Sequence, residues 1–122
     1  MRKSVKIGLL VITIIIVILI SCSTQYKTIE ASLPDLAGKT DGTYRGFYDL
    51  SGTPIKVTLD VTVRGQNITI IDIISHKSSP IGKKAEKITG HIIERQSLDI
   101  DAISGATGSS KAILKAVENA LQ

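Results

Sequence analysis

The chain of 122 residues carries a formal net charge of +4 at pH 7, with 43% hydrophobic and 21% charged residues. Three basic residues, Arg2, Lys3 and Lys6, stand at the N-terminus, and the other 12 Lys and Arg nearly balance 11 Asp and Glu. Because Trp is absent and other aromatic residues are few, the sequence offers neither the basic face nor the stacking platform of a nucleic-acid-binding protein. Two histidines without a companion Cys/His cluster give no basis for a metal site.

The N-terminus has the layout of a secretory signal. The basic residues precede an apolar run of 14 residues, 7–20, shorter than the roughly 20 residues that cross a bilayer as a helix. The run ends in Leu19–Ile20–Ser21–Cys22, which resembles the bacterial lipobox, whose cysteine becomes a lipidated N-terminus. We therefore predict a lipoprotein signal over residues 1–22 and a lipid-anchored domain on the extracytoplasmic face of the cell membrane. An uncleaved anchor is the alternative.

Cys22 is the only cysteine of the chain, so no disulfide can form within it. A lone cysteine in an exported protein can also be a reactive thiol or a bridge between chains. Its position directly after the apolar run favours lipidation at Cys22.

The remaining sequence is predicted to form a tether and one domain. Residues 23–40 are polar and mixed, with Pro34 and Gly38, and are expected to connect membrane and domain. Residues 41–122 are enough for one small domain and not for two. A bound cofactor would stabilise so small a domain, because it would bind only the folded state.

Alternation of apolar and polar residues predicts a sheet. Four apolar residues between Lys56 and Arg64 alternate with polar ones, which is the pattern of a half-buried strand: Val57, Leu59, Val61 and Val63. Residues 65–67 predict a turn, and residues 68–74 predict a returning strand. Residues 44–48 are expected to add a third strand at an edge.

Two helices are predicted after the strands. The first runs from about residue 81 to residue 95, with Gly90 weakening its middle by about 1 kcal/mol relative to Ala. Its expected inner face is Ile81, Ala85, Ile88 and Ile92. The second begins near Ser109, where apolar residues recur at helical spacing: Ile113, Ala116, Val117, Ala120 and Leu121. Strands followed by helices predict an α+β domain, a small antiparallel sheet packed by two helices.

The segment from Asp101 to Ser109 places small and hydroxyl-bearing residues directly before the second helix. Ser109 is predicted to be the N-cap, where free backbone N–H groups and the positive end of the helix dipole form an anion site. Gly105 and Gly108 would let the backbone approach a ligand closely. This pattern alone fits a phosphate site and a plain helix cap equally well, because short motifs give false positives.

Asp101, followed by Ser104–Gly105–Ala106–Thr107–Gly108–Ser109, resembles the flavinylation signature of the FMN-binding domain family. The same domain occurs in the C subunit of sodium-translocating NADH:quinone reductases, in the G subunit of Rnf complexes and in small exported proteins. Four other segments also resemble members of this family: residues 41–46, 55–74, 82–86 and 96–101. The resemblance therefore covers about residues 41–121.

The resemblance implies a covalent flavin. FMN would be joined through a phosphoester to Ser109, which takes the place of the commoner Thr, and a FAD-dependent flavin transferase would install it. The rest of the implied cofactor site is Asp101, Ser104, Gly105, Ala106, Thr107 and Gly108. Asp101 would orient the loop by accepting N–H bonds, with a polar turn residue as its alternative role. Thr107 would bond the phosphate or the flavin edge, or pack under the loop.

Two further features have a plain and a functional interpretation. His76 follows the returning strand and is either an exposed loop residue or a neighbour of the flavin ring. Lys83, Lys84 and Lys87 form a basic cluster, which is by default a solvated helix face and otherwise a docking surface for an acidic redox partner.

The function implied is that of an electron carrier rather than a stand-alone enzyme. It would take electrons from a membrane dehydrogenase or quinone-linked redox protein and deliver them to an external acceptor, with the flavin doing the chemistry. One alternative is a module of a flavin-dependent reductase or a subunit of a respiratory complex. Another is a flavin-free lipoprotein that binds a partner or solute.

Overall fold

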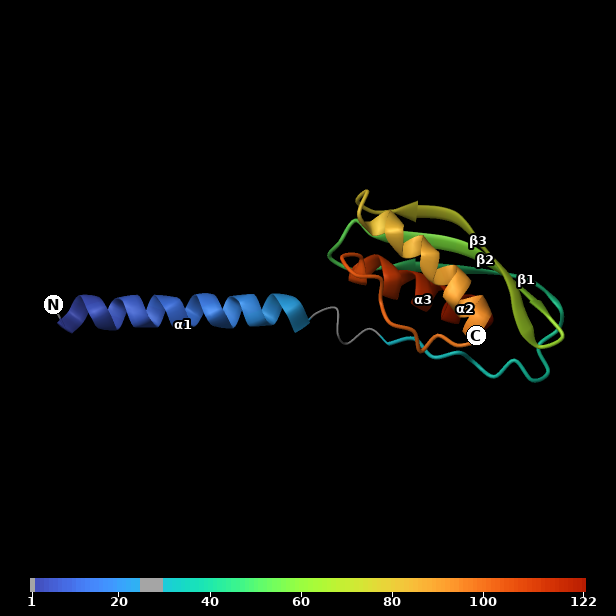
Figure 1. The fold of residues 1–122 in the computed structure, drawn as a ribbon, viewed down its shortest axis with the longest axis horizontal. Coiled ribbons are helices and arrows are strands. Elements are labelled where there is room, and N and C mark those ends of the chain that lie inside the picture. The colour runs from blue at the N-terminus through green and yellow to red at the C-terminus, as the bar shows by residue number, and fades with distance from the viewer. Residues whose placement is uncertain (1, 25–29) are drawn as a thin grey trace.

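The computed structural model describes residues 2–24 and 30–122, with side chains described for 4–17 and 30–122. Its elements are α1 (Arg2–Thr24), β1 (Gly42–Asp49), β2 (Lys56–Arg64), β3 (Asn67–Lys77), the 3₁₀-helix η1 (Gly82–Lys87), α2 (Ile88–Arg95) and α3 (Thr107–Leu121) (Figure 1). Residues 42–121 thus form a three-stranded sheet with α2 and α3, which confirms the predicted α+β class.

Helix α1 contains the apolar N-terminal run and continues past Cys22 to Thr24. Its described apolar side chains, between Val5 and Val17, are exposed. Judged on the residues that the structure describes, no helix is long and apolar enough to cross a membrane. The side chain of Cys22 lies outside the described residues, so its lipidation stays a prediction.

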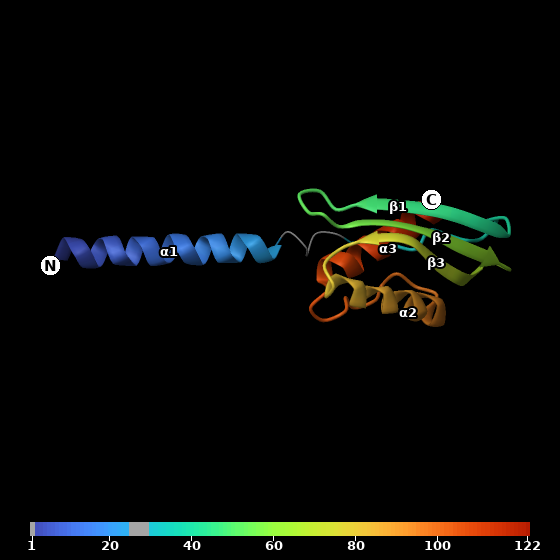
Figure 2. The same cartoon turned by 90° about the horizontal axis from the view of Figure 1, so that it is seen from above.

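The sheet is antiparallel with the strand order β1-β2-β3, and the three strands lie side by side in Figure 2. The alternation predicted for β2 is confirmed, because its four apolar side chains are fully buried: Val57, Leu59, Val61 and Val63. The pairing of β2 with β3 contains two register shifts. As a result Ile71 and Ile73 pack against the core, whereas Ile70 and Ile74 are exposed on the other face.

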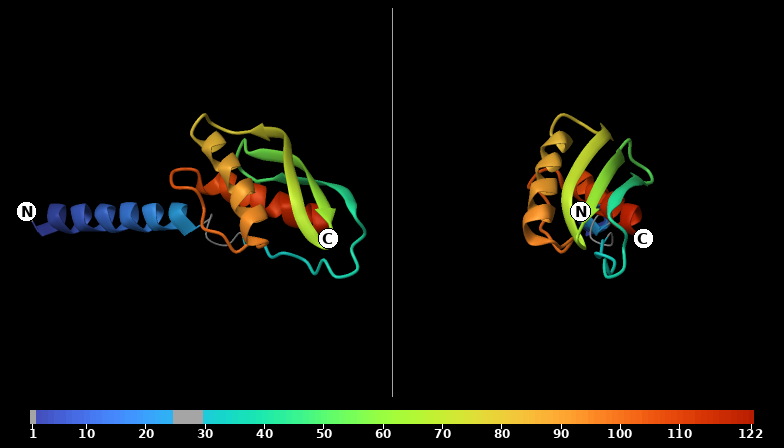
Figure 3. Two further views of the ribbon diagram at one scale, coloured as in Figure 1. Left: turned by 45° about the vertical axis from the view of Figure 1, so that its right-hand side comes forward. Right: turned by 90° about the vertical axis from the view of Figure 1, so that its right-hand side faces the viewer.

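Helix α3 packs on β1 and β2, and α2 packs on β3, so both helices cover the same face of the sheet (Figure 3). The contact of α3 with β1 is close at Gly46. A Cβ atom at Gly46 would overlap the backbone carbonyl of Ala116 and would lie 2.8 Å from the Cβ of Ala120. The missing side chain therefore lets the C-terminal half of α3 rest directly on the strand.

The helix predicted over residues 81–95 is divided into η1 and α2. Ala85, Ile88 and Ile92 are fully buried as predicted. The inner position predicted for Ile81 is wrong, because this side chain is 57% exposed. A 3₁₀-helix has about 3.0 residues per turn instead of 3.6, so the first turn does not keep the phase of the α-helical pattern.

Part of the segment predicted to be a tether packs on the domain. Leu36 belongs to the hydrophobic core. The backbone N–H of Ser32 donates to Oε2 of Glu118 at 3.3 Å, and Nζ of Lys39 donates to the carbonyl oxygen of Leu121 at 2.6 Å. The packed region therefore begins about ten residues before the boundary predicted at residue 41.

Candidate functional site

A cleft of about 530 Å³ opens at the N-terminal end of α3. Three segments line it: the loop after β1 (residues 52–55), the connection from β3 into η1 (Ser78, Ser79 and Gly82) and the start of α3 (residues 105–109). Its volume lies in the range of roughly 300–1,000 Å³ that is usual for small-molecule sites. The segment singled out by the sequence therefore forms one wall of a ligand-sized cleft.

Helix α3 begins at Thr107 with Ala106 as its N-cap, so the prediction that Ser109 is the N-cap is wrong. The helix begins earlier because Gly105 adopts a positive φ of 78° and turns the chain, and Ala106 N–H donates to Ile103 O at 2.9 Å. Ser109 is thus the third residue of the first turn. The first-turn N–H groups of a helix have no acceptor within it, so the end of α3 remains suited to an anion.

The Ser109 hydroxyl is buried and has no partner. The residue is 2% exposed, and its Oγ makes no hydrogen bond with the described residues. A Cβ atom at Gly82 would lie 2.7 Å from this Oγ and 2.7 Å from Oγ of Ser78. Buried polar side chains are nearly always hydrogen-bonded. The Ser109 hydroxyl therefore lies at the cleft wall, in space that a side chain at position 82 would occupy.

The hydroxyl of the neighbouring Ser110, by contrast, is fully hydrogen-bonded. Its Oγ accepts from Ile103 N–H at 3.0 Å and donates to Ala106 O at 2.7 Å, within the buried interior. These two bonds fasten the motif loop to the first turn of α3. This role of Ser110 was not predicted, although a serine is able to bond back to the backbone carbonyl four residues before it, here that of the N-cap Ala106.

The remaining predicted site residues divide into two groups. Four of them line the cleft with Ser109: Gly105, Ala106, Thr107 and Gly108. Thr107 is exposed, so it does not pack under the loop. Asp101 and Ser104 are exposed and lie outside the cleft lining, and the Asp101 carboxylate accepts no hydrogen bond from the described residues. The loop-orienting role of Asp101 stays a prediction.

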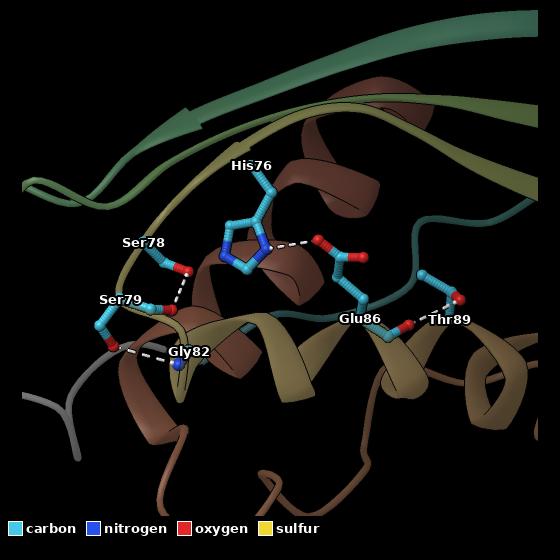
Figure 4. Close-up of polar contacts among 6 residues, drawn as sticks. All are labelled: His76, Ser78, Ser79, Gly82, Glu86 and Thr89. Carbon is cyan, nitrogen blue, oxygen red and sulfur yellow. Dashed lines mark hydrogen bonds and ion pairs between the residues drawn. The ribbon is translucent and has the colours of Figure 1, made fainter.

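His76 is not the exposed loop residue that was one of its two interpretations. It pairs with Val57 at the end of β3, and its side chain is only 1% exposed. Its Nδ1 lies 3.0 Å from Oε1 of Glu86, and its buried Nε2 has no partner among the residues that the structure describes (Figure 4). By contrast, the three lysines of the basic cluster are exposed, as their plain interpretation predicts: Lys83, Lys84 and Lys87.

Comparison with known proteins agrees with this geometry. Residues 51–122 match the FMN-binding domain family, and this stretch contains all the residues that line the cleft and all of α3. Since it covers more than half of the chain, the protein belongs to the FMN-binding domain family.

Two relatives carry the domain within longer chains. A stretch of 80 residues is 41% identical to NADH:acrylate oxidoreductase of Vibrio harveyi and covers 62% of this chain and 8% of that protein. A stretch of 81 residues is 36% identical to an uncharacterized protein of Treponema pallidum (strain Nichols), covering 63% of this chain and 22% of that protein. The chain therefore spans less than a quarter of either relative.

The residues at the cleft fit FMN. Its phosphate matches the N-terminal turn of α3, where N–H groups and the helix dipole favour negative charge. The orphaned Oγ of Ser109 offers a point of attachment, and the missing side chain of Gly82 leaves space beside it.

Proposed function

We propose that this protein is a membrane-tethered, extracytoplasmic flavoprotein that carries FMN in a phosphoester bond to Ser109. It would transfer electrons between a membrane redox partner and an external acceptor. The observation that carries this proposal is the buried Oγ of Ser109, which borders the cleft and has no partner among the described residues.

Attachment at Ser109 would resolve the unpaired hydroxyl. Ser109 Oγ would bond to the phosphorus of the FMN half of FAD, and the diphosphate bond would break with AMP as the leaving group, on a FAD-dependent flavin transferase. The phosphoester charge would then lie in the first turn of α3. Ser110 is less suited, because both hydrogen-bonding functions of its Oγ are used by Ile103 and Ala106.

The walls of the cleft suit a flat, largely apolar ring. Pro54 and Ile55 line one side. The exposed Ile81 lies next to the lining residue Gly105, where a Cβ atom would be 3.8 Å from Cγ2 of Ile81. When bound, FMN supplies the electron-transfer chemistry, while the protein supplies position and electrostatics.

The role of electron carrier is supported by the resemblance to part of NADH:acrylate oxidoreductase. The matched stretch is only 8% of that protein, so oxidation of a donor and reduction of an acceptor would need other domains or other chains. A module of a flavin-dependent reductase or respiratory complex is accordingly the second candidate. A membrane dehydrogenase or quinone-linked protein would be the electron donor in either case.

Co-expression of the full chain with an active flavin transferase tests the proposal. Wild-type protein should gain the mass of FMN less one water and should absorb visible light. Ser109→Ala should gain nothing, while the control Ser110→Ala, which removes the adjacent hydroxyl already bonded to Ile103 and Ala106, should still be modified. A colourless wild-type protein without added mass, produced beside a transferase that modifies another substrate, would contradict the proposal and favour the flavin-free lipoprotein.

The tether is tested separately through Cys22. Wild-type protein should be found in the membrane fraction and should carry a lipid mass. Cys22→Ser should lose the lipid mass and keep the ability to accept FMN. A wild-type chain without lipid would contradict the lipoprotein part of the proposal and leave the flavin part standing.

A further inference from the structure

Two buried side-chain atoms in the described part of the chain have no hydrogen-bond partner: Oγ of Ser109 and Nε2 of His76. The proposed attachment accounts for the first atom and leaves the second unexplained. A histidine kept only for packing normally has its buried nitrogens satisfied. Ser109 Oγ lies beside Gly82, and His76 stands two residues before Ser78, whose Oγ also lies beside Gly82.

Glu86 determines which nitrogen of His76 carries the proton. The carboxylate only accepts hydrogen bonds when ionised, so Nδ1–H of His76 donates to Oε1 of Glu86 over 3.0 Å. In the neutral ring Nε2 then presents a lone pair. A carboxylate that orients an imidazole in this way also stabilises the imidazolium formed when Nε2 takes a proton.

The free nitrogen of His76 is directed toward the Ser109 side of the site. In Figure 4 the imidazole points from β3 toward η1, and its unbonded nitrogen faces Ser78 and Gly82. Ser78 Oγ and Ser109 Oγ each lie 2.7 Å from the point where a Gly82 Cβ would be, so the two hydroxyls share one small space. Ser78 Oγ donates to Ser79 O at 3.0 Å, a local bond that rotation of its hydroxyl would release.

We propose that His76 receives, through the Ser78 hydroxyl, the proton that Ser109 Oγ loses when FMN is attached. This inference rests on the proposed function. For this transfer the Oγ–H of Ser109 would donate to Ser78 Oγ, and the Ser78 hydroxyl, released from Ser79 O, would donate to Nε2 of His76. As the Oγ–P bond forms and AMP leaves the FAD phosphorus, the proton moves to Nε2. Glu86 is a positioning residue, and its carboxylate side, 42% exposed, faces the solvent to which the proton is finally lost.

The rate of attachment in variants tests this role. Purified full-length protein without flavin is mixed with transferase and FAD, and intact mass is followed with time. His76→Asn keeps a donor to Glu86, and His76→Gln places an amide near the position of Nε2, but neither accepts a proton. Both should lower kcat for attachment about 100-fold, as expected for loss of a general base, with KM for the protein substrate unchanged. His91→Gln, altered at an exposed histidine of α2, is the control and should react at the wild-type rate.

Glu86→Gln and Ser78→Ala keep the test decisive if the His76 variants do not fold. Glu86 is partly exposed, so its variant should melt at the wild-type temperature and attach FMN about tenfold more slowly. Wild-type kcat in folded His76→Gln, or in folded Glu86→Gln and Ser78→Ala together, would overturn the inference. A slower rate caused only by a raised KM would also overturn it. Absence of attachment in wild-type protein would instead contradict the proposed function.

Discussion

A single methyl group added at Gly82 should slow cofactor attachment in a protein that still folds. In Gly82→Ala the new Cβ would meet Ser109 Oγ at 2.7 Å, Ser78 Oγ at 2.7 Å and Ser78 Cβ at 2.8 Å. Ordinary van der Waals contact begins at 3.4 Å, so the two oxygen contacts are each about 0.7 Å too short. The backbone of Gly82 does not have a positive φ, so alanine is excluded by space and not by conformation.

The size of the effect follows from the cost of overpacking. Inserting a methyl group into a well-packed site costs about 1–3 kcal/mol. If this cost falls on the step in which Ser109 reacts, the rate of attachment drops roughly 5- to 150-fold. We expect Gly82→Ala to fold, with a lower melting temperature, and to take up FMN within this slowed range in the time-resolved mass assay with transferase and FAD.

Gly90→Ala is the matched control for this change. A Cβ at Gly90 meets nothing within 4 Å, and Ala replaces Gly inside α2, so the variant should gain up to about 1 kcal/mol of stability. Its attachment rate should equal that of wild type. If folded Gly82→Ala were modified as fast as Gly90→Ala, the crowding around Ser109 Oγ would not control its reactivity and the reasoning would fail.

Three other changes have distinct outcomes. Gly46→Ala should lower the free energy of unfolding in urea by about 3 kcal/mol or more, because its Cβ would overlap the rigid backbone carbonyl of Ala116; a loss below 1 kcal/mol would show that α3 does not rest on the strand. Ser110→Ala should cost about 1–3 kcal/mol in the same assay, because the backbone N–H of Ile103 loses its partner while Ala106 O still accepts from Ser110 N–H, and FMN attachment should persist; loss of attachment in the folded variant would assign Ser110 to the cofactor site. Hydrogen bonds from Arg45 hold the pKa of Asp60 below its ordinary value, so the pair stabilises the fold above that ordinary pKa and loses this effect as the pH falls through the lowered one. An NMR titration should therefore give an Asp60 midpoint that rises in Arg45→Ala, and an unchanged midpoint would refute the assignment.

The sheet and the last helix were predictable because their patterns are periodic and local. Alternation over β2 identified the buried residues, and helical spacing identified the buried face of α3. The register shifts between β2 and β3 were not predictable, because a bulge depends on how two strands pair and not on either strand alone. For this reason the exposure of Ile70 and Ile74 could be found only in the structure.

The ligand chemistry of the motif was predictable from the sequence, but the arrangement of its residues in space was predictable only in part. Its glycines and hydroxyls predicted a phosphate site or a helix cap, and the resemblance to the flavinylation signature indicated FMN. The helix start at Thr107, however, depends on the turn that Gly105 makes. The approach of Gly82 and Ser78 to Ser109 comes from packing of η1 against α3, which no spacing in the sequence encodes. Ser109 and Ser110 are adjacent serines that the resemblance to the motif distinguishes by position, and in the structure their hydrogen bonds also distinguish them.

The central claim, that Ser109 carries the flavin, is tested most directly by locating the modification in the chain. After co-expression with transferase, cleavage behind Arg95 and Lys111 releases residues 96–111, which contain every hydroxyl of the motif. Fragmentation of this peptide should place the whole FMN phosphoester on Ser109, with Ser104, Thr107 and Ser110 unmodified. FMN on any of these three residues, or a peptide of unmodified mass from protein exposed to active transferase, would contradict the account.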